Sequence, residues 1–296
     1  MGKSVEEFSQ LSSRNAVQRQ QFPYDVAADE RLFEALRAAF FRSLPLITDS
    51  NVGEAPIFVL GLPNTGIALL ERILSSHSGV KSGGELQAMP LAISQVAGSG
   101  SPGLLGADTV PAISGLSAKL IGERYIDHAA QVIGTSGLRF TDSFPLNFLY
   151  VGWIVAALPN ANIVNLRRGT MDSVWNNFKN TSPADASRYR WSSDLMDTAR
   201  YVLMYQRIMA FWRQRFPGRI HEVIHDLLVN DQDAQVRRML MHCGLSWDDA
   251  CREITTKAAP DADGSAGSGE SGSWREFQDE LGEVIDFFTE NGIPLD

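Results

Sequence analysis

Short apolar runs alternate along the chain with longer segments in which apolar residues recur at the spacing of a helix. Four of the runs predict buried strands, at residues 57–60, 138–142, 161–166 and 219–224. The longest helical patterns cover residues 117–133, 192–216 and 231–243. Shorter ones predict a buried helix over 147–158, a helix that starts at Ser246 and a last helix over 274–289. Strands that alternate with helices in this way predict an α/β fold with a mostly parallel central sheet flanked by helices.

The first fifty residues carry helical patterns only. Residues 3–20 are polar with scattered apolar positions, which predicts a helix at the periphery. A second helix follows, which Asp25 can cap, and its apolar face consists of Leu32, Leu36, Phe40 and Phe41. We therefore divide the chain into an N-terminal helical extension, residues 1–50, and a single α/β domain, residues 51–296.

One stretch combines a strand, a turn and a helix in the order that phosphate-binding loops use. The run at 57–60 is followed by Gly61-Leu-Pro-Asn-Thr-Gly66, and a helical pattern starts directly behind it. This arrangement places backbone N–H groups and a helix N-terminus around an anion. The glycine spacing fits a P-loop, but Ile67 and Ala68 stand where that motif needs Lys and Ser or Thr. The sheet is therefore P-loop-like, and the missing Lys argues against a kinase-like nucleotide enzyme.

Composition and charge narrow the classes of partner and compartment. The net charge is −9, which argues against wholesale nucleic-acid binding, because that requires a basic face. The two cysteines cannot build a disulfide framework, and no spacing of His and Cys indicates a metal site. The N-terminus lacks the apolar segment of a signal peptide, and no apolar run is long enough for a membrane span. We therefore expect a cytoplasmic protein with no metal, no nucleic acid and no membrane contact.

Several stretches, in their order and spacing, resemble the sulfotransferase family over residues 22–290. They are Pro56-Ile-Phe-Val-Leu-Gly-Leu-Pro63, Gly84-Glu-Leu86, Asp142-Ser-Phe-Pro145, Leu158-Pro-Asn-Ala-Asn-Ile-Val-Asn-Leu-Arg-Arg168 and Cys243-Gly-Leu-Ser-Trp247. The chain is most similar to the bacterial branch that is often fused to tetratricopeptide repeats and resembles tyrosylprotein sulfotransferases. The resemblance implies a parallel sheet flanked by helices and transfer of a sulfuryl group from 3′-phosphoadenosine-5′-phosphosulfate (PAPS) to a hydroxyl or amine, without a metal.

The resemblance also implies a donor-binding loop, and the residues that match it are Pro63, Asn64, Thr65, Gly66, Ile67 and Ala68. Asn64 stands at the catalytic position of the family's loop cation, which stabilises the leaving phosphate. Ile67 and Ala68 replace two hydroxyl donors. Thr65 keeps one hydroxyl, and the backbone N–H groups of the loop are unaffected by these changes.

The remaining site residues are implied in the same way. Glu85 aligns with the carboxylate that acts as the acceptor base in tyrosylprotein sulfotransferases. Arg168, at the end of a predicted strand, and Asn176, eight residues later, stand where the family places an Arg and a Ser against the 3′-phosphate of the donor. Gly272 and Trp274 match the Gly-x-Trp of the C-terminal loop that also reaches this phosphate.

Three cationic groups of the family pattern are missing. Asn64 replaces the loop cation, Ser143 replaces a Lys expected at the transferring group, and residues 260–270 are acidic with no basic residue. Each lost charge-assisted hydrogen bond costs roughly 1.5–3 kcal/mol, or about 10–150-fold in affinity. Donor binding is therefore expected to be weak or lost.

Two hypotheses stay open at this point. One is a sulfotransferase with an atypical donor site. The other is a protein of the same fold that has lost donor binding, and that binds a ligand or partner or runs different chemistry in the same cleft. The acceptor of the first is a small molecule or a peptide, held by the segments 87–107 and 183–191. A homo-oligomer and a partner subunit are both compatible with the sequence.

Overall fold

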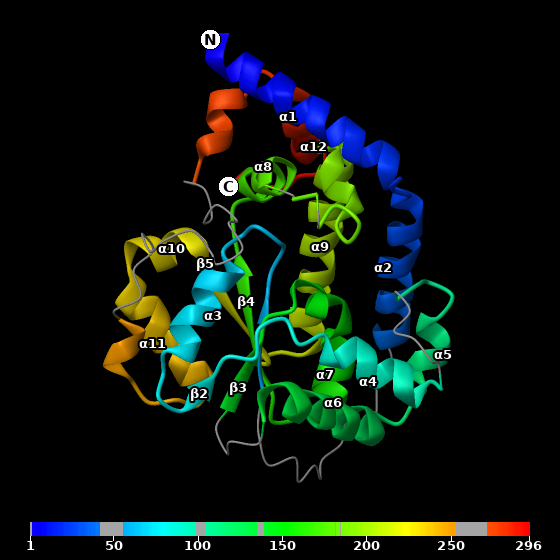
Figure 1. Cartoon of the computed structure of the whole chain (residues 1–296), viewed down its shortest axis with the longest axis vertical. Helices are drawn as coiled ribbons and strands as arrows, with labels where there is room; N and C mark the ends of the chain where they lie inside the picture. Colours follow the sequence, from blue (N-terminus) through cyan, green and yellow to red (C-terminus); the bar gives the residue numbers. More distant parts are fainter. Residues whose placement is uncertain are drawn as a thin grey trace.

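The structure is a computed structural model of the whole chain (Figure 1). It describes residues 2–41, 56–98, 105–134, 139–180, 182–183, 185–252 and 271–296. A five-stranded sheet lies at its centre, with the strands in the order β2-β3-β1-β4-β5. Every neighbouring pair is parallel, so all carboxyl ends of the strands meet at one edge. The α/β fold with a P-loop-like parallel sheet is confirmed.

Of the five strands, four coincide with the predicted apolar runs, and the short one at residues 80–81 lies outside them. They are β1 (Ile57–Leu60), β2 (Val80–Lys81), β3 (Arg139–Asp142), β4 (Asn162–Arg167) and β5 (Ile220–Ile224). In β1 all four residues are buried, because helices cover both faces of the sheet. The apolar run has no polar alternation for this reason. The order of the strands places β1 in the middle, so the loop that follows it opens at the centre of the edge.

Helices form a layer on each face of the sheet (Figure 1). One layer contains α3 (Ile67–Ser75), α10 (His225–Asn230) and α11 (Gln232–His242), whose apolar residues share a core with Val59, Val164 and Val223. The other contains α4 (Ala88–Val96), α5 (Val110–Ser114), α6 (Ala118–Ile133), α7 (Val151–Ala157), α8 (Thr170–Asn180), α9 (Leu195–Arg215) and α12 (Gly282–Glu290). This second core is the larger of the two.

Some helices differ from their predicted extent. The segment predicted as one helix over 147–158 is a 3-10 turn, η1 (Pro145–Tyr150), followed by α7. It is apolar throughout, so no periodic pattern marks where α-helical geometry begins. The helix predicted from Ser246 is only η3 (Asp249–Cys251), in which Asp248 caps the N–H of Ala250.

The end of the chain also departs from its pattern. The last predicted helix, 274–289, is divided into η4 (Ser273–Phe277) and α12. Trp274 and Phe277 are buried like the apolar residues of α12, so the apolar pattern continues across the break. One more 3-10 turn, η2 (Arg190–Ser193), precedes α9.

Two N-terminal helices, α1 (Gly2–Gln21) and α2 (Val26–Phe41), pack on the second layer (Figure 1). The amide of Asn15 in α1 donates to the carbonyl of Phe178, 2.8 Å away, and so satisfies a C-terminal carbonyl of α8. In α2, Leu36 and Phe40 are fully buried in the main core. Residues 42–55, which hold the predicted boundary at position 50, lie outside the described residues, so the division stays a prediction.

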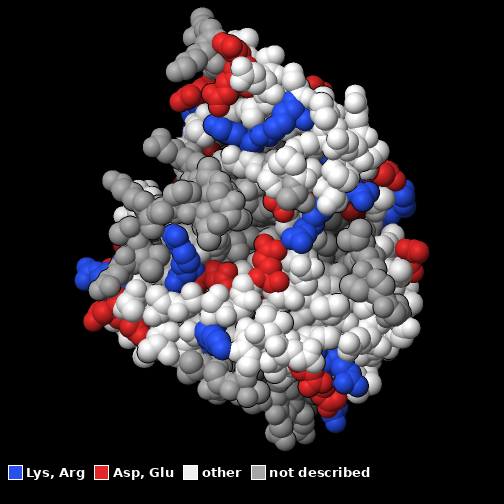
Figure 2. Space-filling view, viewed as in Figure 1, with Lys and Arg blue, Asp and Glu red and all other residues white. Residues whose placement is uncertain are grey.

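Within the described part of the chain, no helix has the combination of length and apolar character that crossing a bilayer requires. Lys and Arg side chains are interspersed with Asp and Glu on the face shown in Figure 2. That face carries no continuous basic surface among the described residues.

Candidate functional site

The loop after β1 lies at the centre of the carboxyl edge of the sheet. Asn64 and Gly66 both adopt left-handed backbone conformations, with φ of 57° and 105°. Gly66 directly precedes α3, whose first N–H groups have no acceptor within the helix. A left-handed residue followed by helical residues turns successive N–H groups toward the same point, which is the geometry of an anion-binding nest. The backbone of this loop can therefore hold a phosphate or sulfate oxygen.

The side chains of the loop contribute less. Thr65 is buried and donates its hydroxyl to the carbonyl of Leu62 at 2.5 Å, so this hydroxyl stabilises the loop itself. Ile67 is buried in the core beneath α3, while Asn64 is half-buried and Ala68 is exposed. Pro63 is buried as well. Among the described residues, no cationic side chain is supplied by the loop.

A carboxylate on α3, that of Glu71, joins the loop helix to the two neighbouring strand ends. One of its oxygens accepts from the N–H of Gly84 at 2.9 Å and from the hydroxyls of Ser82 and Thr141 at 2.9 and 3.0 Å. The other accepts from the hydroxyl of Ser143 at 2.5 Å. Ser143, at the position of the family's Lys, is thus bonded to Glu71, which ties β2, β3 and α3 together.

The turn that Glu71 holds carries Glu85. A Cβ atom on Gly83 would lie 2.2 Å from the carbonyl oxygen of Thr141, so only glycine fits where this turn crosses β3. The carboxylate of Glu85 is 45% exposed and pairs with Arg188 at 3.0 Å. Burial raises the pKa of Glu85, and the adjacent Arg188 partly offsets the rise. Glu85 is thus accessible and held by one partner that a substrate can displace.

Arg168 lies on the other side of the loop, directly after β4. Its guanidinium is buried, and burial lowers its pKa, while the charges of Asp172 and Asp226 raise it. His225, the first residue of α10, packs against the loop: a Cβ atom on Gly66 would lie 3.1 Å from its ring. Arg168, His225 and Gly66 therefore form one cluster.

Asp172 and Asp226 extend this cluster to the C-terminal segment. Asp172 accepts from the N–H of Gly272 at 2.8 Å, and Asp226 accepts from the hydroxyl of Ser271. Asp226 also lies 3.3 Å from Nδ1 of His225. The structure thus brings Gly272 next to the Arg168 cluster, although residues 260–270, the predicted loop without basic side chains, lie outside the described residues.

Asn176 and Trp274 are both buried. The Nδ2 atom of Asn176 and the Nε1 atom of Trp274 have no hydrogen-bond acceptor in the described part of the chain. A buried donor without an acceptor costs free energy unless a ligand or water satisfies it. The N–H groups of these two side chains are therefore suited to donate hydrogen bonds to a bound ligand.

Asp142, at the end of β3, is a structural member of the site. Its carboxylate is fully buried and accepts from the phenol of Tyr125, the amide of Asn147 and the N–H of Phe144. Burial raises the pKa of Asp142 to about 7, although the three hydrogen bonds oppose the shift. These bonds hold the turn that carries Ser143, so the role of Asp142 is structural.

A model of the sulfotransferase family matches residues 56–249, which is most of the chain and includes every strand. The chain belongs to the sulfotransferase family. The match begins at β1 and its loop and ends in η3, so it contains Glu71, Glu85, Arg168 and His225. The family resemblance drawn from the sequence is confirmed.

A relative from Aquifex aeolicus (strain VF5), whose function is uncharacterised, is 28% identical over 252 residues. The match covers 81% of this chain and 33% of that protein, so this sulfotransferase-family chain spans about a third of the length of its relative. The activity and partners of the longer protein are therefore not carried over.

The first of two similar solved structures supports the fold. The sulfotransferase domain of the Synechococcus PCC 7002 olefin synthase has a TM-score of 0.50 and 15% identity, with 84% of this chain and 98% of that chain covered. The sulfotransferase domain from the curacin biosynthetic pathway has a TM-score of 0.49 and 13% identity, with 82% and 99% covered. At these identities the likeness concerns the fold and not the substrate.

No role was assigned from the sequence to Glu71, Arg188 or His225. His225 carries a usable signal, because it directly follows a strand whose carboxyl end faces the site. Glu71 lies among the apolar residues of α3, where a carboxylate needs hydrogen-bond donors. Arg188 has no such signal, because its segment lies near Glu85 only in the folded chain.

No group of three or more His, Cys, Asp or Glu side chains in the described residues has the arrangement of a metal site.

Proposed function

We propose that the chain transfers a sulfuryl group from PAPS to a hydroxyl or amine of a small-molecule or peptide acceptor. The observation that carries this proposal is the arrangement at the edge of the sheet. The Gly66 loop opens at the N-terminus of α3, and the Arg168 cluster lies directly beside it. A phosphosulfate and a second phosphate are the groups that such neighbouring anion sites suit.

The backbone N–H groups and the side-chain amide of the site fit the phosphates of PAPS well. The N–H groups at 66–68 suit the 5′-phosphosulfate, and Arg168 suits the 3′-phosphate. Asn176, with its buried amide lacking an acceptor in the described residues, suits the same phosphate. Gly272 is next to Asp172, so the C-terminal segment starts close to where the 3′-phosphate is expected.

The fit of cationic groups is poor. Asn64 has no charge, and Ser143 already donates to Glu71. Asp172 and Asp226 both lie near Arg168, so two carboxylates offset the one guanidinium. A donor phosphate therefore meets less positive charge than the family pattern provides. We expect millimolar affinity for the bisphosphate product, 3′-phosphoadenosine-5′-phosphate (PAP).

PAPS supplies an activated sulfuryl group whose leaving group is the 5′-phosphate of PAP. Glu85 is the base in this proposal, and it accepts the proton of the acceptor hydroxyl or amine. Its raised pKa makes it a better proton acceptor than an exposed carboxylate. Arg188 must release Glu85, at least in part, when the acceptor arrives. The loop N–H groups stabilise negative charge on the sulfuryl oxygens and on the leaving phosphate.

The second candidate is a protein that keeps the fold without donor binding. Two features favour it. Asp172 and Asp226 offset the charge of Arg168, and the hydroxyl of Ser143 already donates to Glu71, so neither group is fully available to a donor phosphate. In this case the cleft binds a ligand or partner, or runs different chemistry. The cytoplasmic location and any oligomeric partner stay predictions from the sequence.

Calorimetric titration with PAP, together with transfer from sulfur-35-labelled PAPS to phenolic and peptide acceptors, tests the proposal. We expect weak but saturable PAP binding that falls about tenfold or more in Arg168→Gln, because a charge-assisted hydrogen bond is lost. Arg31→Gln, an exposed change in α2, is the matched control. Glu85→Gln is expected to lower turnover and leave PAP binding unchanged.

Absence of PAP binding up to its solubility, combined with no transfer to any acceptor, would overturn the proposal in favour of the second candidate. Micromolar PAP binding would show instead that the missing cations are replaced by groups elsewhere in the chain.

A further inference from the structure

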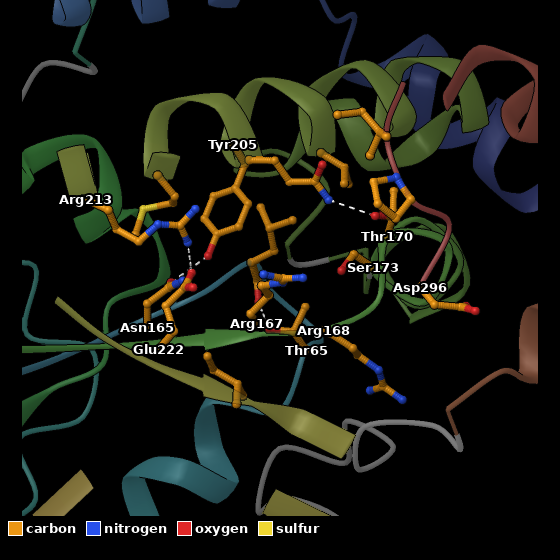
Figure 3. A pocket seen from close by; sticks show the side chains of 17 residues that line it. Thr65, Asn165, Arg167, Arg168, Thr170, Ser173, Tyr205, Arg213, Glu222 and Asp296 are labelled. Carbon is orange, nitrogen blue, oxygen red and sulfur yellow. Dashed lines mark hydrogen bonds and ion pairs between the residues drawn. The ribbon is translucent and has the colours of Figure 1, made fainter. Parts of the chain in front are cut away.

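A cavity of about 200 Å³ lies between the sheet and α9. Successive strand residues point to opposite faces, so Asn165 and Arg167 of its lining lie on one face of β4. Leu166 and Arg168, which also line it, lie toward the other face. Figure 3 shows Arg167 pointing into this cavity and Arg168 pointing away from it. Leu62 and Thr65 of the donor loop line it, and so does Arg168. The cavity therefore adjoins the proposed donor site.

The arginines that line the cavity do not all have a carboxylate partner. Arg213 is paired with Glu222 on β5, and Asp296 at the rim is paired with Arg275, 3.0 Å away. Arg167 makes no ion pair or side-chain hydrogen bond with any described residue. It lies near Arg213, since its charge, after burial, contributes to lowering the pKa of Arg213. Arg168, which also lines the cavity, has Asp172 and Asp226 near it. The exposed Arg167 therefore adds one guanidinium charge in excess, in a chain whose net charge is −9.

The polar groups beside Arg167 are neutral and held in place. The phenol of Tyr205 donates to the amide oxygen of Asn165 at 2.7 Å, and the amide of Gln206 donates to the hydroxyl oxygen of Thr170 at 3.0 Å. Thr170 keeps its own hydroxyl hydrogen for a further acceptor. The cavity thus offers donors from Arg167 and Thr170 to one anionic group.

The rest of the lining is apolar and includes Leu166, Val202, Met209 and Pro294. A dry cavity of roughly 150 Å³ holds a benzene molecule, and drug-sized ligands occupy about 300–1,000 Å³. The volume here therefore suits one ring or a branched chain of similar size. A molecule with one negative charge and an apolar body is complementary to one excess positive charge and an apolar wall.

We propose that the cavity binds a small monocarboxylate with an aromatic or branched apolar body. Its carboxylate lies against Arg167 and Thr170, and its body packs on Val202 and Met209. The cavity shares Arg168 and Thr65 with the proposed donor site, whereas the proposed contacts to the carboxylate come from Arg167 and Thr170. Bound molecules at this site touch the inner side of the donor loop through Thr65.

Titration of the protein with benzoate, without any nucleotide, tests this site. Benzamide has the same shape without the charge, and inorganic sulfate has charge without the apolar body. Benzoate is expected to bind about tenfold or more tightly than benzamide, the lower end for a charge-assisted hydrogen bond. Arg167→Gln is expected to remove this preference and to fold normally, because Arg167 has no partner among the described residues. Arg124→Gln, an exposed arginine on α6, is the matched control.

Equal binding of benzoate and benzamide would overturn the proposal, and so would equal benzoate binding by the Arg167 and Arg124 variants. Displacement of benzoate by an equal concentration of sulfate would overturn the choice of a carboxylate with an apolar body. Met209→Trp, which fills the cavity, is expected to abolish benzoate binding. Since no nucleotide is present, failure of PAP binding leaves these outcomes unchanged.

Discussion

Arg167 and Arg168 are adjacent in the sequence and serve different surroundings. Arg168 faces His225 and the donor loop, whereas Arg167 faces α9 and Tyr205. The alternation of side chains along β4 causes this division. A single strand end can therefore supply a cation to each face of the sheet. The two proposed anion sites differ in the number of carboxylates that lie near their arginine. Arg168 has two carboxylates near it, and Arg167 has none of its own.

His225 gives the proposed donor site a pH dependence. Burial lowers the pKa of His225, and the charge of Arg168 lowers it further, so the free ring is neutral near pH 7. A phosphate bound beside it favours the protonated ring, so binding takes up a proton. PAP affinity is therefore expected to rise as the pH falls from 7.5 to 6, and calorimetry across this range measures it.

The phosphates of PAP titrate in the same range, so the comparison with a variant is essential. His225→Gln removes the ionisable ring, and its affinity is expected to rise less with falling pH. His128→Gln on α6 serves as the control. Parallel pH profiles for the wild type and the His225 variant would exclude His225 from the site.

At the scale of elements, Glu71 connects α3 to the turn with Glu85 and to the end of β3. Glu71→Gln removes the charge and exchanges one acceptor oxygen for a donor group. We expect it to lower the free energy of unfolding by about 1–3 kcal/mol, because four donors share this carboxylate. Urea unfolding measures the change.

Glu123→Gln, on the exposed side of α6, is the matched control and should change stability by less than about 0.5 kcal/mol. A similarly small change for Glu71→Gln would mean that the four hydrogen bonds contribute little, and that the turn is held by Gly83 and the backbone.

Another pair of elements, β5 and α11, meets through two stacked histidines. The centres of the His221 and His242 rings lie 5.3 Å apart, and burial lowers the pKa of both. The charge of His242 lowers the pKa of His221 further, and those of Arg219 and Arg139 lower the pKa of His242. A histidine with a lowered pKa stabilises the folded state above its unfolded pKa of about 6.5 and loses this contribution as the pH falls. Stability is thus expected to decrease below about pH 6.5.

His242→Phe keeps a ring in the stack without the ionisation. Its stability, measured by thermal unfolding between pH 7.5 and 5, is expected to depend less on pH than that of the wild type. Met241→Phe, at an exposed neighbouring position, is the control. An unchanged pH dependence in the His242 variant would place the acid sensitivity elsewhere, for example at His225.

The sequence predicted the elements better than the site. The strands were visible because apolar runs such as 161–166 are buried on both faces. The loop at 61–66 was visible because of its glycine spacing, and Gly66 adopts a left-handed conformation that few other residues share. The contacts of Ser143 with Glu71 and of Arg188 with Glu85 were not visible, since both join residues far apart in the chain. The cavity at Arg167 depends on how α9 lies over β4, which no local pattern specifies.

The whole molecule raises the question of whether the N-terminal helices are an addition to the domain or part of it. The helical patterns of the first fifty residues favoured a boundary at residue 50, but Leu36 and Phe40 of α2 are fully buried in the core that contains α9. Phe40 packs edge to face on Trp153 and Trp212, with ring centres 4.7 and 5.3 Å apart. Such contacts couple α2 to the sheet's second layer.

If α2 belongs to the core, removing a side chain from it must destabilise the entire protein. Leu36→Ala is expected to cost about 2–5 kcal/mol, the range for a large-to-small change in a packed core. Circular dichroism and tryptophan fluorescence should follow one common urea transition, because Trp153 and Trp212 lie in the core that α2 covers. Leu120→Ala, at an exposed position of α6, is the matched control with little expected effect. An early, separate loss of helix signal with unchanged fluorescence would instead establish residues 1–50 as an extension that unfolds on its own.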